Sequence, residues 1–216
     1  AIKLLLATVV VSIITGGLVS LTSRMVSNAG LLALARSLVR DGVADSADPH
    51  ASDLTNAGSW LEAATRLDAT NRGAWRGLGF ALEALGRSDE AITAWQTAGG
   101  MGEDFVQRGE TARGAGQYEE ALKWYEKAKN LAPEKRDSRV LSGVVFAVRS
   151  NYERALLAFQ DALAFSGRTD RFGDSDIYYQ IGLLYQLRFQ PANLAGALTA
   201  YNNAIGQADF QTEGWA

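Results

Sequence analysis

The sequence of 216 residues contains no cysteine, one histidine and three prolines. Without cysteine the chain has no disulfide, no thiolate nucleophile and no cysteine ligand for zinc. The single histidine, His50, leaves no histidine metal pair within one chain, and its place in a loop after Pro49 favours a solvated side chain over a catalytic one. We therefore expect no metal site, no cofactor and no enzyme activity in this chain.

An excess of charge of one sign is also lacking, because 21 basic residues stand against 24 acidic ones and the net charge is −3. A nucleic-acid partner requires a basic patch, which this composition does not provide. The pair Gly77-x-Gly79 lacks the third glycine of a phosphate-binding loop, and the glycines of residues 99–102 follow no strand. Neither a nucleic acid nor a small-molecule substrate is indicated.

The first segment, by contrast, lacks any charge from Leu4 to Ser23, a run of 20 residues. As a helix it would span about 30 Å, the hydrocarbon thickness of a bilayer. A signal peptide is a rival interpretation, but no Ala-x-Ala cleavage site follows. A buried core helix is another, although a helix apolar on every side is hard to place in a small fold. We predict a single membrane-spanning helix that contacts lipid through residues 4–21.

Three small residues in this segment permit close packing against other membrane helices, and they are Gly16, Gly17 and Ser20. Lys3 precedes the segment while Arg24 and Arg36 follow it, so the positive-inside rule is almost silent on orientation. We give a slight preference to an extracytoplasmic position for the rest of the chain.

Five alanines recur along the remaining sequence: Ala57, Ala91, Ala121, Ala155 and Ala197. The first four are separated by 34, 30 and 34 residues. Each is followed four residues later by a bulky side chain and seven residues later by another alanine. This spacing marks one helix face that meets a close neighbour. Self-similarity at such a period predicts stacked helix pairs.

Residues upstream of each alanine complete the unit. In the first full copy these are Trp75, Leu78, Gly79, Leu82 and Gly86, ahead of Ala91 and Trp95. The pattern resembles the tetratricopeptide repeat, which reads Trp-x2-Leu-Gly-x2-Tyr and then Ala-x3-Phe. Further copies carry Gly109, Gly143 and Gly182 at the glycine position. The resemblance covers roughly residues 50–216 and implies an all-α fold, a right-handed α-solenoid of helix–turn–helix repeats.

The sequence therefore divides into a transmembrane anchor (1–24), a connecting and capping segment (25–50) and a solenoid (51–216) of four full repeats with partial units at both ends. We expect Asn28–Val39 to supply the first helix of the partial N-terminal unit. Trp215 falls where the opening tryptophan of another repeat belongs, which indicates missing residues or a capping partner.

In the tetratricopeptide family the first helices form a concave groove that binds a partner segment. The resemblance implies these groove residues here: Arg76, Phe80, Glu83, Val106, Glu110, Arg113, Val140, Val144, Val148, Tyr179, Leu183, Gln186 and Leu187. The family clamp for a C-terminal carboxylate uses Lys and Asn, which these positions lack, so binding of chaperone tails is not expected. The third and fourth repeats instead offer an apolar wall, suited to an amphipathic helix or an extended apolar segment. Alternatively, the chain's own Leu31–Val39 or a downstream segment fills the groove.

These observations predict a non-catalytic scaffold or accessory subunit of a membrane protein complex, with other subunits as its partners. An alternative is the last membrane helix and solenoid of a longer polytopic enzyme of the glycan polymerase or ligase type. A third possibility is an assembly factor that visits its client transiently.

Overall fold

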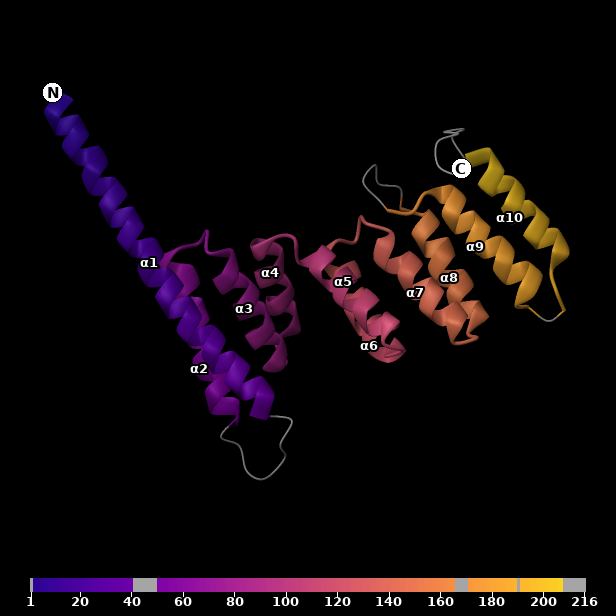
Figure 1. The fold of residues 1–216 in the computed structure, drawn as a ribbon, viewed down its shortest axis with the longest axis horizontal. Coiled ribbons are helices and arrows are strands. Elements are labelled where there is room, and N and C mark those ends of the chain that lie inside the picture. Colours follow the sequence, from indigo (N-terminus) through magenta and orange to yellow (C-terminus); the bar gives the residue numbers. More distant parts are fainter. Residues whose placement is uncertain (1, 41–49, 166–170, 190, 208–216) are drawn as a thin grey trace. The chain divides into compact units, whose positions relative to one another are not determined.

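The computed structural model describes residues 2–40, 50–165, 171–189 and 191–207, where every regular element is an α-helix (Figure 1). In chain order the described helices are α1 (Ile2–Arg40), α2 (His50–Leu67), α3 (Arg72–Ala84), α4 (Ser88–Ala98), α5 (Met101–Gly114), α6 (Tyr118–Leu131), α7 (Asp137–Val148), α8 (Tyr152–Leu163), α9 (Asp174–Leu187) and α10 (Leu194–Gln207). They follow one another as consecutive helix pairs, which confirms the all-α helix–turn–helix fold. The right-handed solenoid remains a prediction, and Trp215 lies outside the described residues.

The chain divides into two compact units, Ala1–Met101 and Gly102–Ala216. The first unit contains α1 to α4, and the second contains α5, from its second residue, to α10. The repeat period did not indicate a division at this point.

The two helices of each pair meet where a glycine of the first helix faces a large side chain of the second. The facing residues are Gly30 and Leu61, Gly79 and Trp95, Gly109 and Tyr125, Gly143 and Phe159, and Gly182 and Tyr201. A Cβ at any of these glycines would lie within 3.0 Å of its partner's side chain, which real Cβ atoms essentially never do. The glycine thus lets a ring or a leucine side chain rest on the helix backbone, and the repeat register read from the sequence is confirmed.

The recurring alanines lie beside these contacts. Ala57, Ala91, Ala121 and Ala155 are fully buried, and Ala197 is nearly so. Because protein interiors are close-packed, a larger side chain at these positions has no space to occupy.

We expect Ala121→Leu to lower the free energy of unfolding of the second unit by about 1–3 kcal/mol, because the added atoms must displace buried neighbours. Urea denaturation followed by circular dichroism measures this loss. A matched Lys123→Leu change, at an exposed position on the same helix, should alter stability by less than about 0.5 kcal/mol. Equal stability of the two variants would contradict the assigned register.

The turns within three of the pairs repeat one geometry. Gly86, Gly116 and Ser150 each have positive φ angles, of 76°, 76° and 58°. The next residue donates its backbone N–H to the carbonyl five residues earlier, as Gln117 does to Ala112 at 2.8 Å. This is the Schellman arrangement, which satisfies the last carbonyls of the first helix and turns the chain into the second.

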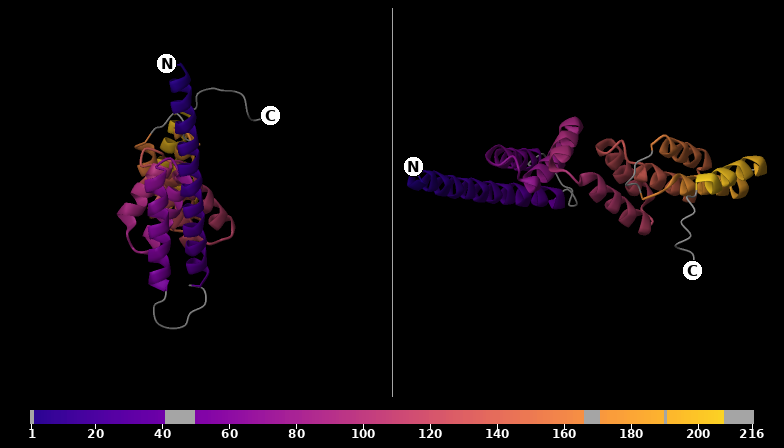
Figure 2. Two further views of the ribbon diagram at one scale, coloured as in Figure 1. Left: turned by 90° about the vertical axis from the view of Figure 1, so that its left-hand side faces the viewer. Right: turned by 90° about the horizontal axis from the view of Figure 1, so that it is seen from above.

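α1 is one unbroken helix of 39 residues, and its C-terminal half runs beside α2 (Figures 1 and 2). Small residues face α2, because Ser23, Ser27 and Gly30 are all buried. The predicted boundary at residue 24 and the predicted helix start at Asn28 therefore match no break in the backbone. The first helix of the first pair is continuous with the apolar N-terminal segment.

Ser23 connects three helices of the first unit. Its hydroxyl donates to the Ala64 carbonyl oxygen at 2.8 Å and accepts a hydrogen bond from Asn71 Nδ2 at 3.0 Å. The oxygen of the same amide, Asn71 Oδ1, accepts a hydrogen bond from the backbone N–H of Ala74 and so caps the N-terminus of α3. Residues just before position 24 thus already belong to the packed fold.

Candidate functional site

No group of three or more His, Cys, Asp or Glu residues that could hold a metal ion occurs in the part of the chain that the structure describes. The candidate sites on the described helices are surfaces that could bind another protein. Two kinds are present, one formed by the first helices of the pairs and one lying between successive second helices.

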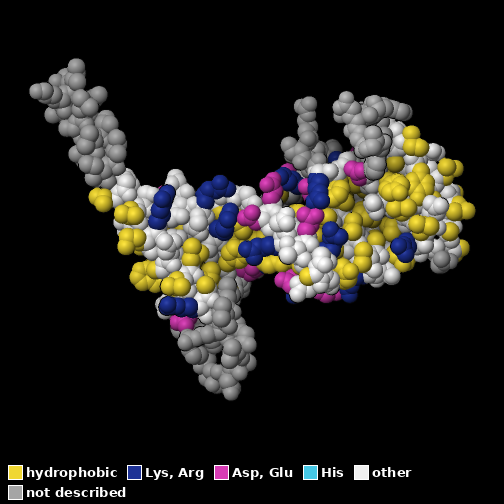
Figure 3. Space-filling model, in the orientation of Figure 1, with side chains coloured by type: hydrophobic (Ala, Val, Ile, Leu, Met, Phe, Trp, Pro, Cys, Tyr) yellow, Lys and Arg dark blue, Asp and Glu magenta, His cyan; other side chains and the backbone are white. Residues whose placement is uncertain are grey.

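The first surface, here called the inner wall, consists of Val144 and Val148 on α7 and of Tyr179, Leu183 and Leu187 on α9. Val148, Tyr179 and Leu187 are each more than half exposed, and the other two are half-buried. We call the glycine that faces the second helix the contact glycine, which is Gly143 in α7 and Gly182 in α9. Val144 and Leu183 follow it by one residue, and Val148 and Leu187 follow it by five. Figure 3 shows hydrophobic side chains gathered over this part of the second unit.

Val140 was predicted to line the groove but is only 2% exposed. It shares a core cluster with Phe159 of α8 and with Ile177 and Ile181 of α9. Because the next helix pair covers it, Val140 contributes to stability and offers nothing to a partner.

Gln186 is exposed but engaged, since the Tyr201 hydroxyl donates to its Oε1 at 2.8 Å. The rings of Tyr201 and Tyr179 lie 5.9 Å apart, and burial raises the pKa of the Tyr201 hydroxyl. The Tyr201 hydroxyl thus holds the Gln186 amide beside the inner wall through this hydrogen bond.

On α5 the chain itself covers part of the predicted groove. The Arg171 guanidinium forms an ion pair with Glu110 at 2.8 Å. The neighbouring Phe172 packs against the core cluster that contains Tyr125, with Val106 also at its edge. Val106, Glu110 and Arg113 are all half-buried. The segment leading into α9 therefore covers part of the predicted groove on α5.

In the first unit, the predicted groove residues do not form one apolar surface. Phe80 packs edge-on against the Trp95 ring with 5.3 Å between centroids, Arg76 is exposed and Glu83 is half-buried. In the second unit, by contrast, Val144 of α7 packs against the core cluster that contains Ile177, Ile181 and Leu184 of α9.

The small residues predicted to pack in the membrane have different surroundings. A Cβ added to Gly16 or Gly17 would meet nothing within 4 Å. Ser20 is half-buried near Asp68, the pKa of which lies below its usual value because of hydrogen bonds from Thr70 and, to a smaller degree, Ser20. Ser20 therefore lies close to the packed first unit.

The second surface is a groove between α2 and α4 in the first unit, which the sequence analysis missed. It has a volume of about 400 Å³, and its floor consists of Trp75, Leu78 and Leu82 of α3 and of Leu85 just after this helix. A signal existed, because the spacing of these residues matches one face of a helix, but such residues are usually core.

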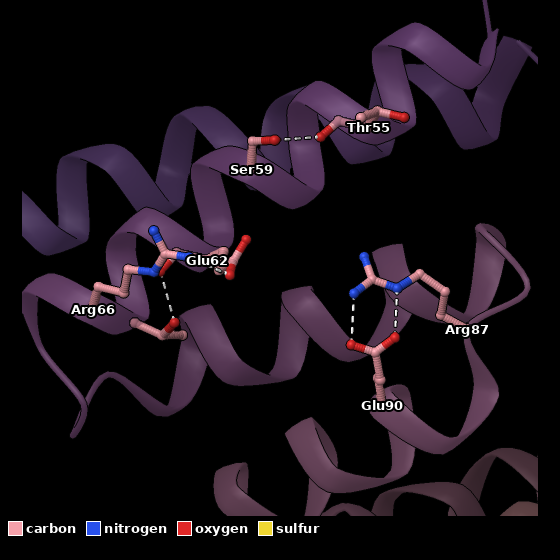
Figure 4. Close-up of polar contacts among 7 residues, drawn as sticks. Thr55, Ser59, Glu62, Arg66, Arg87 and Glu90 are labelled. Atoms are coloured by element: carbon pink, nitrogen blue, oxygen red, sulfur yellow. Dashed lines mark hydrogen bonds and ion pairs between the residues drawn. The ribbon is translucent and has the colours of Figure 1, made fainter.

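Polar side chains form the two walls of this groove (Figure 4). On α2, Arg66 pairs with Glu62 at 2.6 Å, and at the start of α4, Arg87 pairs with Glu90 through two bonds of 2.6 Å. The Arg87 hydrogen bonds hold the pKa of Glu90 below its usual value. Each charge is paired within its own wall, so the groove has no strong preference for one sign of ligand charge.

An equivalent groove of about 570 Å³ lies in the second unit between α6 and α8. Its floor includes Phe146 of α7, and its walls include Lys123 and the largely exposed Leu157. Such grooves thus recur at the same place in the repeat architecture of each unit.

Comparison with known families supports the repeat assignment. Residues 103–135, which include most of α5 and all of α6, match the family model described as Tetratricopeptide repeat. The chain therefore contains a tetratricopeptide repeat, and the resemblance noted in the sequence is confirmed for this segment. No curated protein matches the chain at a significant level.

Solved structures of repeat proteins resemble the chain distantly. MamA is 16% identical, with 76% of this chain and 93% of that chain covered and a TM-score of 0.46. YrrB, described as a TPR protein with an unusual peptide-binding site, is 20% identical with coverage of 83% and 87% and a TM-score of 0.43. A structure of the APC/C hetero-tetramer Cut9–Hcn1 is 17% identical, with 88% of this chain and 37% of that chain covered and a TM-score of 0.42.

Proposed function

We propose that this chain, whose helix pairs include a tetratricopeptide repeat, is a non-catalytic scaffold that holds a partner protein on the inner wall of its second unit. The observation that carries the proposal is the exposure of Val148, Tyr179 and Leu187, three large apolar side chains on two helices of one unit. Exposed apolar surface of this kind usually marks a partner site in a soluble domain.

The chemistry of the wall defines the partner segment. The five inner-wall residues carry no charge, and Tyr179 supplies the only side-chain hydroxyl among them. An amphipathic helix or an extended apolar segment would bury these side chains, whereas a charged peptide would leave its charges unpaired.

We further propose that α1 anchors the scaffold in a membrane, so that the partner is a subunit of a membrane complex. The stretch Thr15–Ser37 is a helix long and apolar enough to cross a bilayer, although a core helix or a signal sequence meets the same criterion. Support for the anchor comes from the uncharged run Leu4–Ser23, in which residues 15–19 are exposed on α1.

A second candidate function is the C-terminal part of a longer polytopic membrane enzyme, with the repeats serving the same binding role. The intact mass of the native protein distinguishes the two, because a scaffold subunit needs only one membrane helix. A transient assembly factor would differ from a permanent subunit in the lifetime of its complex.

The inner wall is tested by the double change Val148→Glu and Leu187→Glu in the full chain, purified from native membranes with its partners. Burying two carboxylates on binding costs several kcal/mol, so recovery of the partner should fall at least tenfold. Val148 and Leu187 suit the test because both already face solvent, so circular dichroism should not change.

The matched control adds the same charge elsewhere in the second unit, through Asn130→Glu and Gln160→Glu on α6 and α8. Both residues are exposed and lie outside the inner wall. Loss of the same partner from the control, or its retention by the wall variant, would reject the inner wall as the binding surface.

A further inference from the structure

The contact glycines give all first helices a common register, which shows how one pair packs on the pair before it. Counted from Gly182 of α9, the residues five before, one before and two after are Ile177, Ile181 and Leu184. They are 0%, 6% and 3% exposed and share a core cluster with residues of α8. In α3 the same positions hold Ala74, Leu78 and Ala81, which are also buried.

In α1 these positions, counted from Gly30, hold Met25, Ala29 and Leu32. All three are apolar, as in α9, but Met25 is 66% exposed, Leu32 is 54% exposed and Ala29 is exposed as well. We call these three residues the first end face. It has the composition of a face that packs on a preceding second helix, yet no described helix covers it.

The last described helix, α10, shows the complementary situation. In α8, Tyr152, Leu156 and Leu163 pack against the core cluster that contains Ile177, Ile181 and Leu184 of α9. Counted from Ala155 and Ala197, the equivalent residues of α10 are Leu194, Leu198 and Ile205. They are 65%, 62% and 65% exposed, and we call them the last end face.

We infer that the first end face of one copy packs on the last end face of a second copy, as α9 packs on α8 within the chain. Both faces are uncharged: α10 contains no charged residue, and α1 contains none from Met25 to Ala35. The internal α8–α9 contact shows that this chain buries such a pair of surfaces when they meet. Because the two faces differ, the contact is heterologous and can repeat from copy to copy.

The absence of cysteine makes the test direct, since introduced thiols are the only ones in the chain. Two full-length copies with different tags, one carrying Ala29→Cys and the other Leu198→Cys, are expressed together and treated in native membranes with a short thiol-reactive cross-linker. We expect a cross-linked dimer that contains both tags. No cross-linked dimer is expected when both tagged copies carry the same cysteine.

Thr199→Cys serves as the matched control, because Thr199 is exposed but lies about 100° around the helix from Leu198. It should cross-link to Ala29→Cys at least tenfold less. Adding Leu194→Glu to the Leu198→Cys copy should also remove the mixed dimer, while helical circular dichroism stays unchanged.

The other outcomes reject the inference. Dimers of Leu198→Cys with itself would place two last end faces against each other. No cross-link in any combination would mean that other proteins, lipid or further chain cover the faces. Equal cross-linking of the Thr199→Cys control would indicate chance collision in the membrane.

Discussion

The combined change Gly109→Ala, Gly143→Ala and Gly182→Ala is expected to unfold the second unit. Each added methyl group would overlap the ring of Tyr125, Phe159 or Tyr201. Overpacking of this kind costs about 1–3 kcal/mol per site, and three separate sites add to a loss comparable with the total stability of a domain, about 5–15 kcal/mol. Circular dichroism and limited proteolysis would measure the loss.

A matched control separates packing from helix propensity. Gly114 lies on the same helix as Gly109, and a Cβ there would meet nothing within 4 Å. Because alanine favours a helix over glycine by up to about 1 kcal/mol, Gly114→Ala should leave stability unchanged or raise it. The single change Gly109→Ala should lower it. The same sign for both variants would contradict the helix-pair contact.

Removal of residues 1–19 is expected to move the protein from the membrane fraction to the soluble fraction while the helix pairs stay folded. The deletion takes away most of the uncharged run but keeps Ser20, Ser23 and the part of α1 that packs against α2. Fractionation of cell extracts and circular dichroism of the soluble protein measure the two effects.

The longer deletion of residues 1–24 provides the comparison. It also removes the Ser23 hydroxyl, which leaves the Asn71 amide without this acceptor and should cost about 1–3 kcal/mol. The longer deletion should therefore be soluble but less stable than the shorter one. If the shorter deletion remains in the membrane fraction or aggregates, the anchor assignment is wrong.

The repeat register could be predicted because a close helix contact requires small residues at fixed positions. Ala121 and Gly109 are small because the buried Tyr125 side chain needs space beside them. This packing requirement can be read from the spacing of the residues in the sequence. The helix α1 could not be delimited in this way. Arg24 marks a change in polarity, but no proline or glycine pair follows it to end the helix.

The burial and pairing of the predicted groove residues could not be predicted from the sequence, because both depend on contacts between residues that are distant in the chain. Val140 and Tyr179 hold the same repeat position, but Val140 is buried in a core cluster with residues of α8 and α9, whereas Tyr179 is 51% exposed. The Glu110–Arg171 ion pair joins residues 61 apart in the chain, and no local pattern predicts such a contact.

The division into two units has a sequence correlate that the repeat pattern concealed. At the positions where α9 has Ile177, Ile181 and Leu184, α5 has Asp104, Arg108 and Thr111. Polar residues replace the apolar set where one pair would pack on the previous one, and the boundary between the units lies at Met101–Gly102.

Site-specific photo-cross-linking from the inner wall tests the scaffold function most directly. A photoreactive amino acid replaces Leu187 in the full chain in native membranes, and the matched probe replaces Asn130 on α6. We predict one protein cross-linked from position 187, absent from position 130, and lost when Val148→Glu is added. Cross-linking of the same protein from position 130 would contradict the inner wall as the binding surface. So would cross-linking from Ser59, in the groove between α2 and α4, instead of position 187.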